Sequence, residues 1–241
     1  MDTFARSLRE RKNWVRLVLS AVIFFAVALP FRQLLNLMPG ITEIRPANMI
    51  PPVLGLIWGP FAGGAIAIGN LISDMVSGSN AFICTTGFIA NFLYAYLPYK
   101  LWYSVAVQED DLYPTLGSVR KILKYICVML LDSLVVTGML SFIFETAGFS
   151  ASGSSYALLF FNNFDFTVLL GVPVLIFLER FRPDYRVPAA HKRKEGGYWA
   201  FDLLLAAAAA LGLGWFLLSL LRGSPVDSRT AAVLLAASVL L

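Results

Sequence analysis

The chain has 241 residues, of which 58% are hydrophobic and 14% are charged, and its formal net charge is +4. Soluble domains usually carry about 25% charged residues, so this composition excludes an ordinary soluble domain and indicates an integral membrane protein. Two cysteines and one histidine are too few for a disulfide framework or a metal cluster, and the basic residues do not gather on a soluble face that could bind nucleic acid.

Long apolar runs predict the helices. A helix needs about 20 apolar residues to cross the hydrocarbon core, and fewer where neighbouring helices shield it. On this rule we predict helices at 14–34, 47–58, 61–75, 81–103, 122–147 and 156–178, and a seventh at 198–221. The final apolar run, 230–241, is too short to cross, and is either a partial or interfacial helix or the beginning of a truncated one. The predicted fold class is therefore an all-α integral membrane protein.

The domain organisation follows from these runs. Residues 1–180 form one six-helix membrane domain, 181–197 form a basic loop, and 198–241 form one or two additional C-terminal helices. Lys and Arg in short loops mark the cytoplasmic side of a membrane. They gather before the first helix, between the fourth and fifth, and after the sixth, at Arg6, Arg9, Arg11, Lys12, Arg16, Arg120, Lys121, Lys124, Arg180, Arg182, Arg186, Lys192, Arg193 and Lys194. We therefore expect a multi-pass protein whose N-terminus and basic loop lie in the cytoplasm, with the loop against anionic lipid.

The segment between the first and third helices is interrupted by prolines and glycines. Pro51 and Pro52 suit the start of a helix, and the Gly59–Pro60 step ends one helix and begins the next. Small residues recur at every fourth position, at Gly55, Gly59, Gly63 and Ala67. This stripe either lets helices pack closely or forms a surface that docks a partner membrane subunit or slides during transport. Arg45, at the entrance of the second helix, either anchors at the membrane interface or binds an anionic ligand.

Polar residues inside the sixth helix are candidate ligand-binding residues, because such residues are costly in lipid. Asn162 and Asp165 lie three apart and face the same way, roughly 10–14 Å below the outer end of the helix. Asn163 points to another side. The alternative role for these side chains is hydrogen bonding between helices.

Other predicted helices carry further candidates. Glu145 lies near the outer end of the fifth helix, and Asn91 and Tyr94 lie three apart on the fourth. Together with the sixth helix these side chains supply amides, carboxylates and aromatic rings, which can hold a flat polar heterocycle. Asp132, near the middle of the fifth helix, is either a protonated structural contact or a proton-linked switch.

The stretch IRPANMIPPVLGLIWGPFAGGAIAIGNLISD resembles the second and third helices of the substrate-binding S components of energy-coupling factor (ECF) vitamin transporters. The resemblance extends in outline over about residues 14–180. It implies a prokaryotic cell-membrane protein with a six-helix bundle that holds a vitamin-like small molecule near the outer face. It also implies as partners a transmembrane coupling subunit and two cytoplasmic ATPases. Two features depart from the family: the first helix lacks the Ala-x-x-x-Ala pattern often used for the coupling subunit, and 198–241 exceeds the six-helix plan.

Two functions are compatible with this sequence. The leading expectation is a substrate-binding subunit that captures a vitamin-like solute for ECF-type import. The alternative is a ligand-sensing membrane domain of the same fold that relays occupancy to a cytoplasmic effector. We expect no enzymatic activity and no cofactor, because no His-rich motif, serine nucleophile setting or phosphate-binding loop with a lysine occurs.

Overall fold

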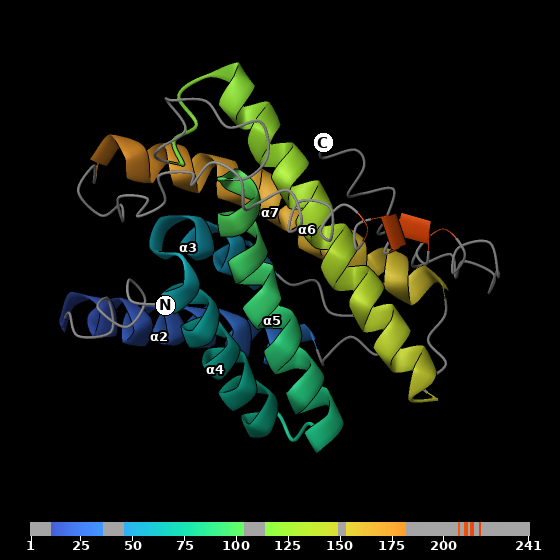
Figure 1. Cartoon of the computed structure of the whole chain (residues 1–241). Helices are drawn as coiled ribbons and strands as arrows, with labels where there is room; N and C mark the ends of the chain where they lie inside the picture. Colours follow the sequence, from blue (N-terminus) through green and yellow to red (C-terminus); the bar gives the residue numbers. More distant parts are fainter. Residues whose placement is uncertain are drawn as a thin grey trace, which may run out of the picture.

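The computed structural model describes residues 11–35, 46–103, 114–148 and 153–181, together with single helical positions between 207 and 217. Every element in these ranges is helical, so the predicted all-α class is confirmed for this part of the chain (Figure 1). The elements are α2 (Arg11–Leu35), the 3-10 helix η1 (Pro46–Met49), α3 (Ile50–Trp58), α4 (Pro60–Val76), α5 (Ala81–Trp102), α6 (Val119–Thr146) and α7 (Gly153–Phe181).

The described helices lie where the apolar runs predict them. The second predicted helix begins as η1 and continues as α3, and the largest shifts, as at the start of α2 (residue 11 against the predicted 14), are of three residues. Arg45 lies outside the described residues. So do the basic loop after Phe181 and the predicted C-terminal helices, apart from the single positions between 207 and 217.

Among the described residues, four helices are long and apolar enough to cross a membrane: Asn13–Pro30 within α2, Ala81–Trp102, Val119–Thr146 and Tyr156–Arg180 within α7. A shorter apolar helix covers Phe61–Val76. At nine residues, α3 is too short to span the hydrocarbon core by itself. All of its residues except Trp58 are buried, so the longer helices shield it from the surroundings.

The break between α3 and α4 follows from local backbone chemistry. Pro51 and Pro52 occupy the first turn of α3, where a missing N–H costs no helical hydrogen bond. Gly59 has φ +65°, a conformation that glycine adopts without strain, and its N–H donates to Gly55 O at 2.7 Å. Pro60 then begins α4 with its φ already in the helical range.

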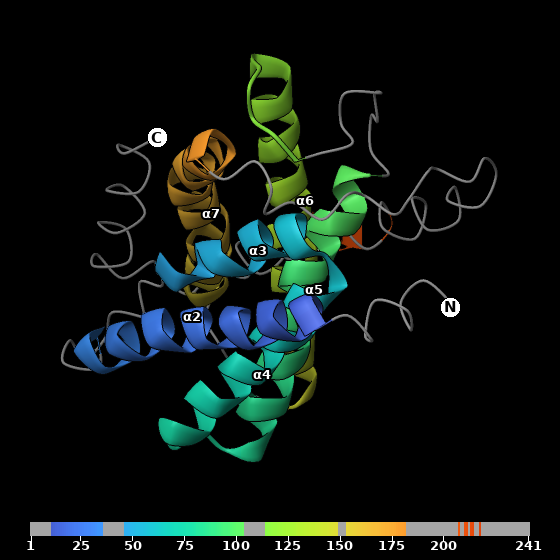
Figure 2. The ribbon, with the colours of Figure 1, turned by 90° about the vertical axis from the view of Figure 1, so that its left-hand side faces the viewer.

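Glycines let three helix pairs approach closely. A Cβ at Gly55 would overlap the carbonyl oxygen of Ala95, so α3 and α5 cross in backbone contact. A Cβ at Gly63 would lie 3.3 Å from Phe92 O of α5, and one at Gly69 2.9 Å from Ala21 O of α2. Figures 1 and 2 show α4 beside α5 and α2 crossing α4. Three residues of the predicted small-residue stripe, Gly55, Gly59 and Gly63, thus pack against α5 within this chain, and Ala67 of the same stripe is fully buried.

The main apolar core joins α3, α5, α6 and α7, where Leu175 is its buried member on α7. Its buried members include Leu56 and Ile57 of α3, Trp102 of α5 and Met129 of α6. A second core lies between α2, α3 and α4, where Phe24 packs with Ile66. Many large apolar side chains remain exposed on the outer faces, among them Trp14, Val18, Val22, Met75, Val76, Leu123, Phe142 and Phe177. Such a surface suits contact with lipid rather than water.

Replacing Gly55 with Ala should destabilise the protein, because the new methyl group meets a backbone carbonyl that cannot rotate away. We expect a loss of about 1–3 kcal/mol, seen as a lower thermal unfolding midpoint of the purified protein. The matched control is Gly64→Ala on α4, where an added Cβ would meet nothing within 4 Å. Equal destabilisation by both substitutions would contradict the close α3–α5 crossing.

Candidate functional site

A buried hydrogen-bond network holds the middle of α7. Asn163 and Thr167 lie one helical turn apart on one face of α7. Asn48 of η1 donates through Nδ2 to Asn163 Oδ1 at 2.8 Å. The Thr167 hydroxyl lies 2.7 Å from Asn163 O and 3.3 Å from Asn48 O. These contacts fix η1, and with it the entrance of α3, against α7.

Two tyrosines extend this network to α5 and α6. The Tyr94 hydroxyl bonds to Asn163 O and lies 2.6 Å from Thr167 Oγ1. The Tyr125 hydroxyl donates to Thr167 O at 2.9 Å. A Cβ at Gly171, one turn further along α7, would overlap the Tyr125 hydroxyl, so glycine leaves the space that this bond needs. Hydrogen bonds of this kind tie helices together where apolar packing alone provides little discrimination.

Asp132 lies near the network without joining it. It is seven residues beyond Tyr125 on the same face of α6, and it is 0% exposed. Neither carboxylate oxygen has a hydrogen-bond partner in the described part of the chain. Asp132 lies within electrostatic range of both the Tyr94 and Tyr125 phenols.

The six predicted ligand-binding residues are not all brought together. Arg45 lies outside the described residues. Asn91 donates through Nδ2 to Gly87 O of its own helix at 2.9 Å, whereas Tyr94 belongs to the central network. Glu145, in the last turn of α6, lies close enough to Tyr156 for its charge to act on that phenol.

Asn162 and Asp165 are buried, at 8% and 5% exposure. Helical geometry places Asp165 about 160° around α7 from Thr167, so the predicted pair and the network occupy different faces. Asp165 Oδ1 has no hydrogen-bond partner among the described residues, and neither has the buried Tyr156 hydroxyl. The two faces of α7 therefore differ: one is fully bonded through Asn163 and Thr167, and the other holds a carboxylate oxygen that lacks a partner.

Aromatic side chains lie beside this second face. Phe161 is four residues before Asp165 and is therefore its neighbour along the helix surface. Phe160 stacks on Phe164 with ring centroids 5.8 Å apart and meets Phe161 edge-on at 5.3 Å. These rings belong to a small apolar cluster with Leu134 of α6.

A second buried polar pair holds α4 to α5. Asn70 donates through Nδ2 to Asp74 Oδ2 at 2.6 Å. A Cβ at Gly87 of α5 would lie 2.7 Å from that oxygen and 2.8 Å from the Asn70 nitrogen, so α5 packs directly on the pair. Because the pair is covered by a helix backbone, its role is packing.

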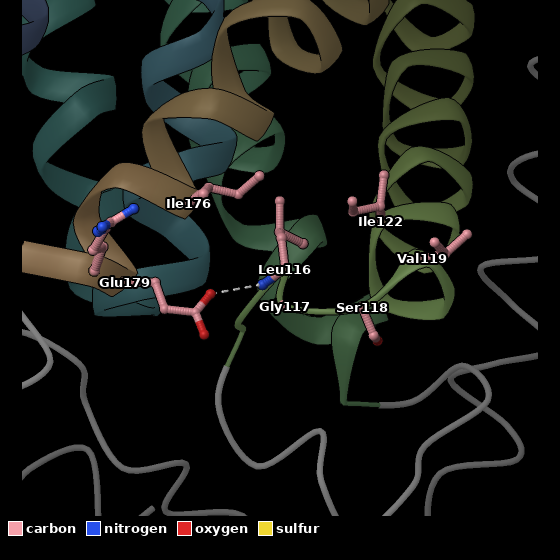
Figure 3. A pocket seen from close by; sticks show the side chains of 8 residues that line it. Leu116, Gly117, Ser118, Val119, Ile122, Ile176 and Glu179 are labelled. Atoms are coloured by element: carbon pink, nitrogen blue, oxygen red, sulfur yellow. Dashed lines mark hydrogen bonds between the residues drawn. The ribbon is translucent and has the colours of Figure 1, made fainter.

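An open cleft of about 490 Å³ lies at the opposite end of α6 and α7 from Glu145 (Figure 3). Its walls are mostly apolar, with Leu116, Ile122 and Ile176 among them. Glu179 accepts a hydrogen bond from the Leu116 N–H at 3.1 Å and so closes the segment before α6 onto α7. Nearby, the Lys124 ammonium lies 4.9 Å from the centre of the Trp102 ring.

Sequence reasoning did not single out Asn48, Tyr125 or Thr167. The four-residue spacing of Asn163 and Thr167 was a usable signal, because it places an amide and a hydroxyl on one helix face. The contact between Asn48 and Asn163 joins residues 115 positions apart, so no local pattern could reveal it.

The chain was compared with known proteins. No protein-family model matches it, and the comparisons with curated proteins and with solved structures found no match either. The candidate site is therefore argued only from the residues and contacts described above.

Replacing Thr167 with Val should loosen the hold on α7, because the hydroxyl contacts to Asn163, Asn48 and Tyr94 are lost while shape is kept. We expect a loss of about 1–2 kcal/mol, measured as a lower thermal unfolding midpoint. Thr85→Val is the matched control, because Thr85 is exposed and its hydroxyl bonds only to Ala81 O of its own helix, at 2.8 Å. If both variants unfold at the wild-type temperature, the network does not stabilise the fold.

Proposed function

We propose that this chain is a substrate-binding membrane subunit that captures a vitamin-like small molecule at the outer face for ECF-type import. The observation that carries the proposal is the Asp165 carboxylate, which is buried on α7 with one oxygen that has no hydrogen-bond partner in the described ranges. A buried polar atom of this kind is rare in folded proteins and is explained when a bound group supplies the missing donor.

The surroundings of Asp165 suit a small heterocycle. Asn162 adds an amide on the same side of α7, and Phe161 adds a half-buried ring. Aromatic walls with a few placed polar groups are typical of small-molecule sites. Asp165 is twelve residues from Gly153 at the start of α7, which is about 18 Å along the axis. In the orientation that the basic loops predict, Asp165 therefore lies in the outer half of the bundle.

The resemblance of the α3–α4 region to S components is the reason for proposing ECF-type import rather than another kind of transport. In the described residues the short helix α3, the Gly59–Pro60 turn and the glycine-rich helix α4, with Asp74 near its end, follow one another. These features support the proposal without identifying the solute.

One observation favours the alternative, a ligand-sensing membrane domain. The exposed face of α2 carries Trp14, Val15, Val18 and Val22, where S components often have small residues for the coupling subunit. Large and branched side chains prevent the close helix contact that small residues allow. Under this alternative the same site binds its ligand, and a cytoplasmic effector receives the signal.

Ligand capture can be tested by the thermal unfolding of the purified protein with a panel of water-soluble vitamins. A true ligand at about 100 times its Kd should stabilise the protein by about 2.7 kcal/mol, because it binds only the folded state. Asp165→Asn and Asn162→Ala should abolish this shift while leaving the unliganded midpoint near that of the wild type. The control is Thr146→Val, because Thr146 is exposed and bonds only within α6.

Wild-type shifts in both α7 variants would refute the site. Partner proteins distinguish import from sensing. Co-purification of a membrane coupling subunit with two ATPases supports import. Co-purification of a cytoplasmic effector without these subunits supports sensing.

A further inference from the structure

We propose that Asp132 binds a monovalent cation, either a proton or a sodium ion, and that this cation keeps α7 docked on α5 and α6 through Tyr94 and Tyr125. The inference does not depend on the proposed solute, because it concerns the opposite face of α7 from Asp165. It starts from a carboxylate that is 0% exposed in the middle of a membrane-length helix.

The first step is the cost of this carboxylate. Both oxygens of Asp132 lack a hydrogen-bond partner within the described ranges, and no Lys, Arg or His is paired with it there. A bare charge in apolar surroundings is expensive, so it needs a proton, a counter-ion or new hydrogen bonds. One of these must neutralise it for the observed packing to persist.

The second step is the supply of hydrogen-bond donors. A phenol has a single proton to donate. Tyr125 donates its proton to Thr167 O, and the Tyr94 hydroxyl is bonded to Asn163 O and Thr167 Oγ1. Both phenols within electrostatic range of Asp132 are therefore already committed to α7.

These two steps set up a competition. An ionised Asp132 is a stronger acceptor than a backbone carbonyl, because hydrogen bonds to charged groups are about twice as strong. Its charge would attract the phenol protons and so weaken the contacts of the two tyrosines to Asn163 and Thr167. A proton or a sodium ion on Asp132 removes this competition and leaves the phenols on α7.

The ligand class follows from the oxygen atoms near Asp132. Ser133 Oγ is buried and lies beside the Tyr94 phenol, and Asp132 lies within electrostatic range of the same phenol, so a carboxylate, an alcohol and a phenol supply oxygen atoms in this region. Oxygen atoms suit a hard cation. A single carboxylate balances one positive charge, whereas a divalent ion would leave a net charge in the core. No group of three or more Asp, Glu, His or Cys residues that could hold a metal ion occurs in the described part of the chain.

Few other titratable groups face this region. Tyr94 of α5 and Tyr125 of α6 are the two phenols, and α3 has no titratable residue. On α7, Asp165 lies on the face away from Thr167. On α6, Lys121 and Lys124 lie about three and two turns away, where Lys121 bonds to Thr115 Oγ1 and the Lys124 ammonium sits over Trp102.

The test combines thermal unfolding with hydrogen exchange of the α7 segment around Thr167, using the whole chain in lipid nanodiscs. Each is measured between about pH 5 and pH 9, in sodium chloride and in choline chloride at about 0.15 M. We expect acid or sodium to raise the unfolding midpoint by several degrees and to slow α7 exchange several-fold. Asp132→Asn, which is neutral at every pH, should show the high midpoint and slow exchange throughout.

Two further variants test whether the cation acts at Asp132 and through the tyrosine contacts to α7, rather than by a general increase in protein stability. Tyr125→Phe removes one phenol from α7, so α7 should exchange quickly and respond less to the cation. Asp165→Asn is the matched carboxylate-to-amide control: it should keep the sodium response and the response of α7 exchange, and lose only the part of the acid stabilisation that Asp165 itself contributes, although the solute proposed above no longer binds to it. A failure of solute capture is thus distinguishable from a failure of cation binding.

The outcomes identify which cation, sodium or a proton, binds to Asp132. A response to sodium at fixed pH that is lost in Asp132→Asn identifies a sodium site. A response to pH that is equal in sodium and choline, and lost in the same variant, identifies a proton site. The proposal is overturned if the wild type responds to neither, or if Asp132→Asn keeps the wild-type response.

Discussion

Asn163 and Thr167 of α7 make hydrogen bonds to η1, α5 and α6. These bonds fix the relative positions of the helices, which apolar packing alone does not determine. Helices in lipid gain little from burying apolar side chains against one another, because lipid tails are as apolar as the helices. Direction and register therefore come from the few polar groups that must find partners inside the bundle. Here one turn of α7 meets Asn48, Tyr94 and Tyr125 at once, so the position of α7 is fixed by three different elements.

The short helix α3 depends on the same arrangement. A nine-residue helix cannot cross a bilayer, and it persists because longer helices surround it and glycine lets α5 touch its backbone. Its entrance is η1, which the Asn48–Asn163 bond holds to α7. The Gly59–Pro60 turn then sends α4 back along α5. The interrupted segment is thus fixed at its beginning by a hydrogen bond, in its middle by close packing and at its end by backbone conformation.

Local features of the sequence were sufficient to predict the helices but not the site. Apolar runs and the Gly59–Pro60 step act over a few residues, so helix positions follow from them directly. Helical spacing also placed Asn163 on a different side from Asn162 and Asp165, as it is in the structure. It could not say which side meets Tyr94, because that depends on how α5 and α7 cross. Asn91 illustrates the limit: its spacing from Tyr94 suggested a shared role, whereas its amide bonds to its own helix.

The two proposals meet in α7, which carries Asp165 on one face and Thr167 on the other. A helix transmits a rotation or shift along its whole length, since its backbone hydrogen bonds resist bending. A ligand that gains contacts by drawing Asp165 toward it must therefore act against the bonds at Thr167, and a cation on Asp132 sets how strongly those bonds resist. Linkage then requires that the effect be mutual: a cation that favours one position of α7 must be bound more tightly when a ligand that prefers the same position is present. Import and sensing alike could use such a coupling, because each needs the occupied bundle to differ from the empty one.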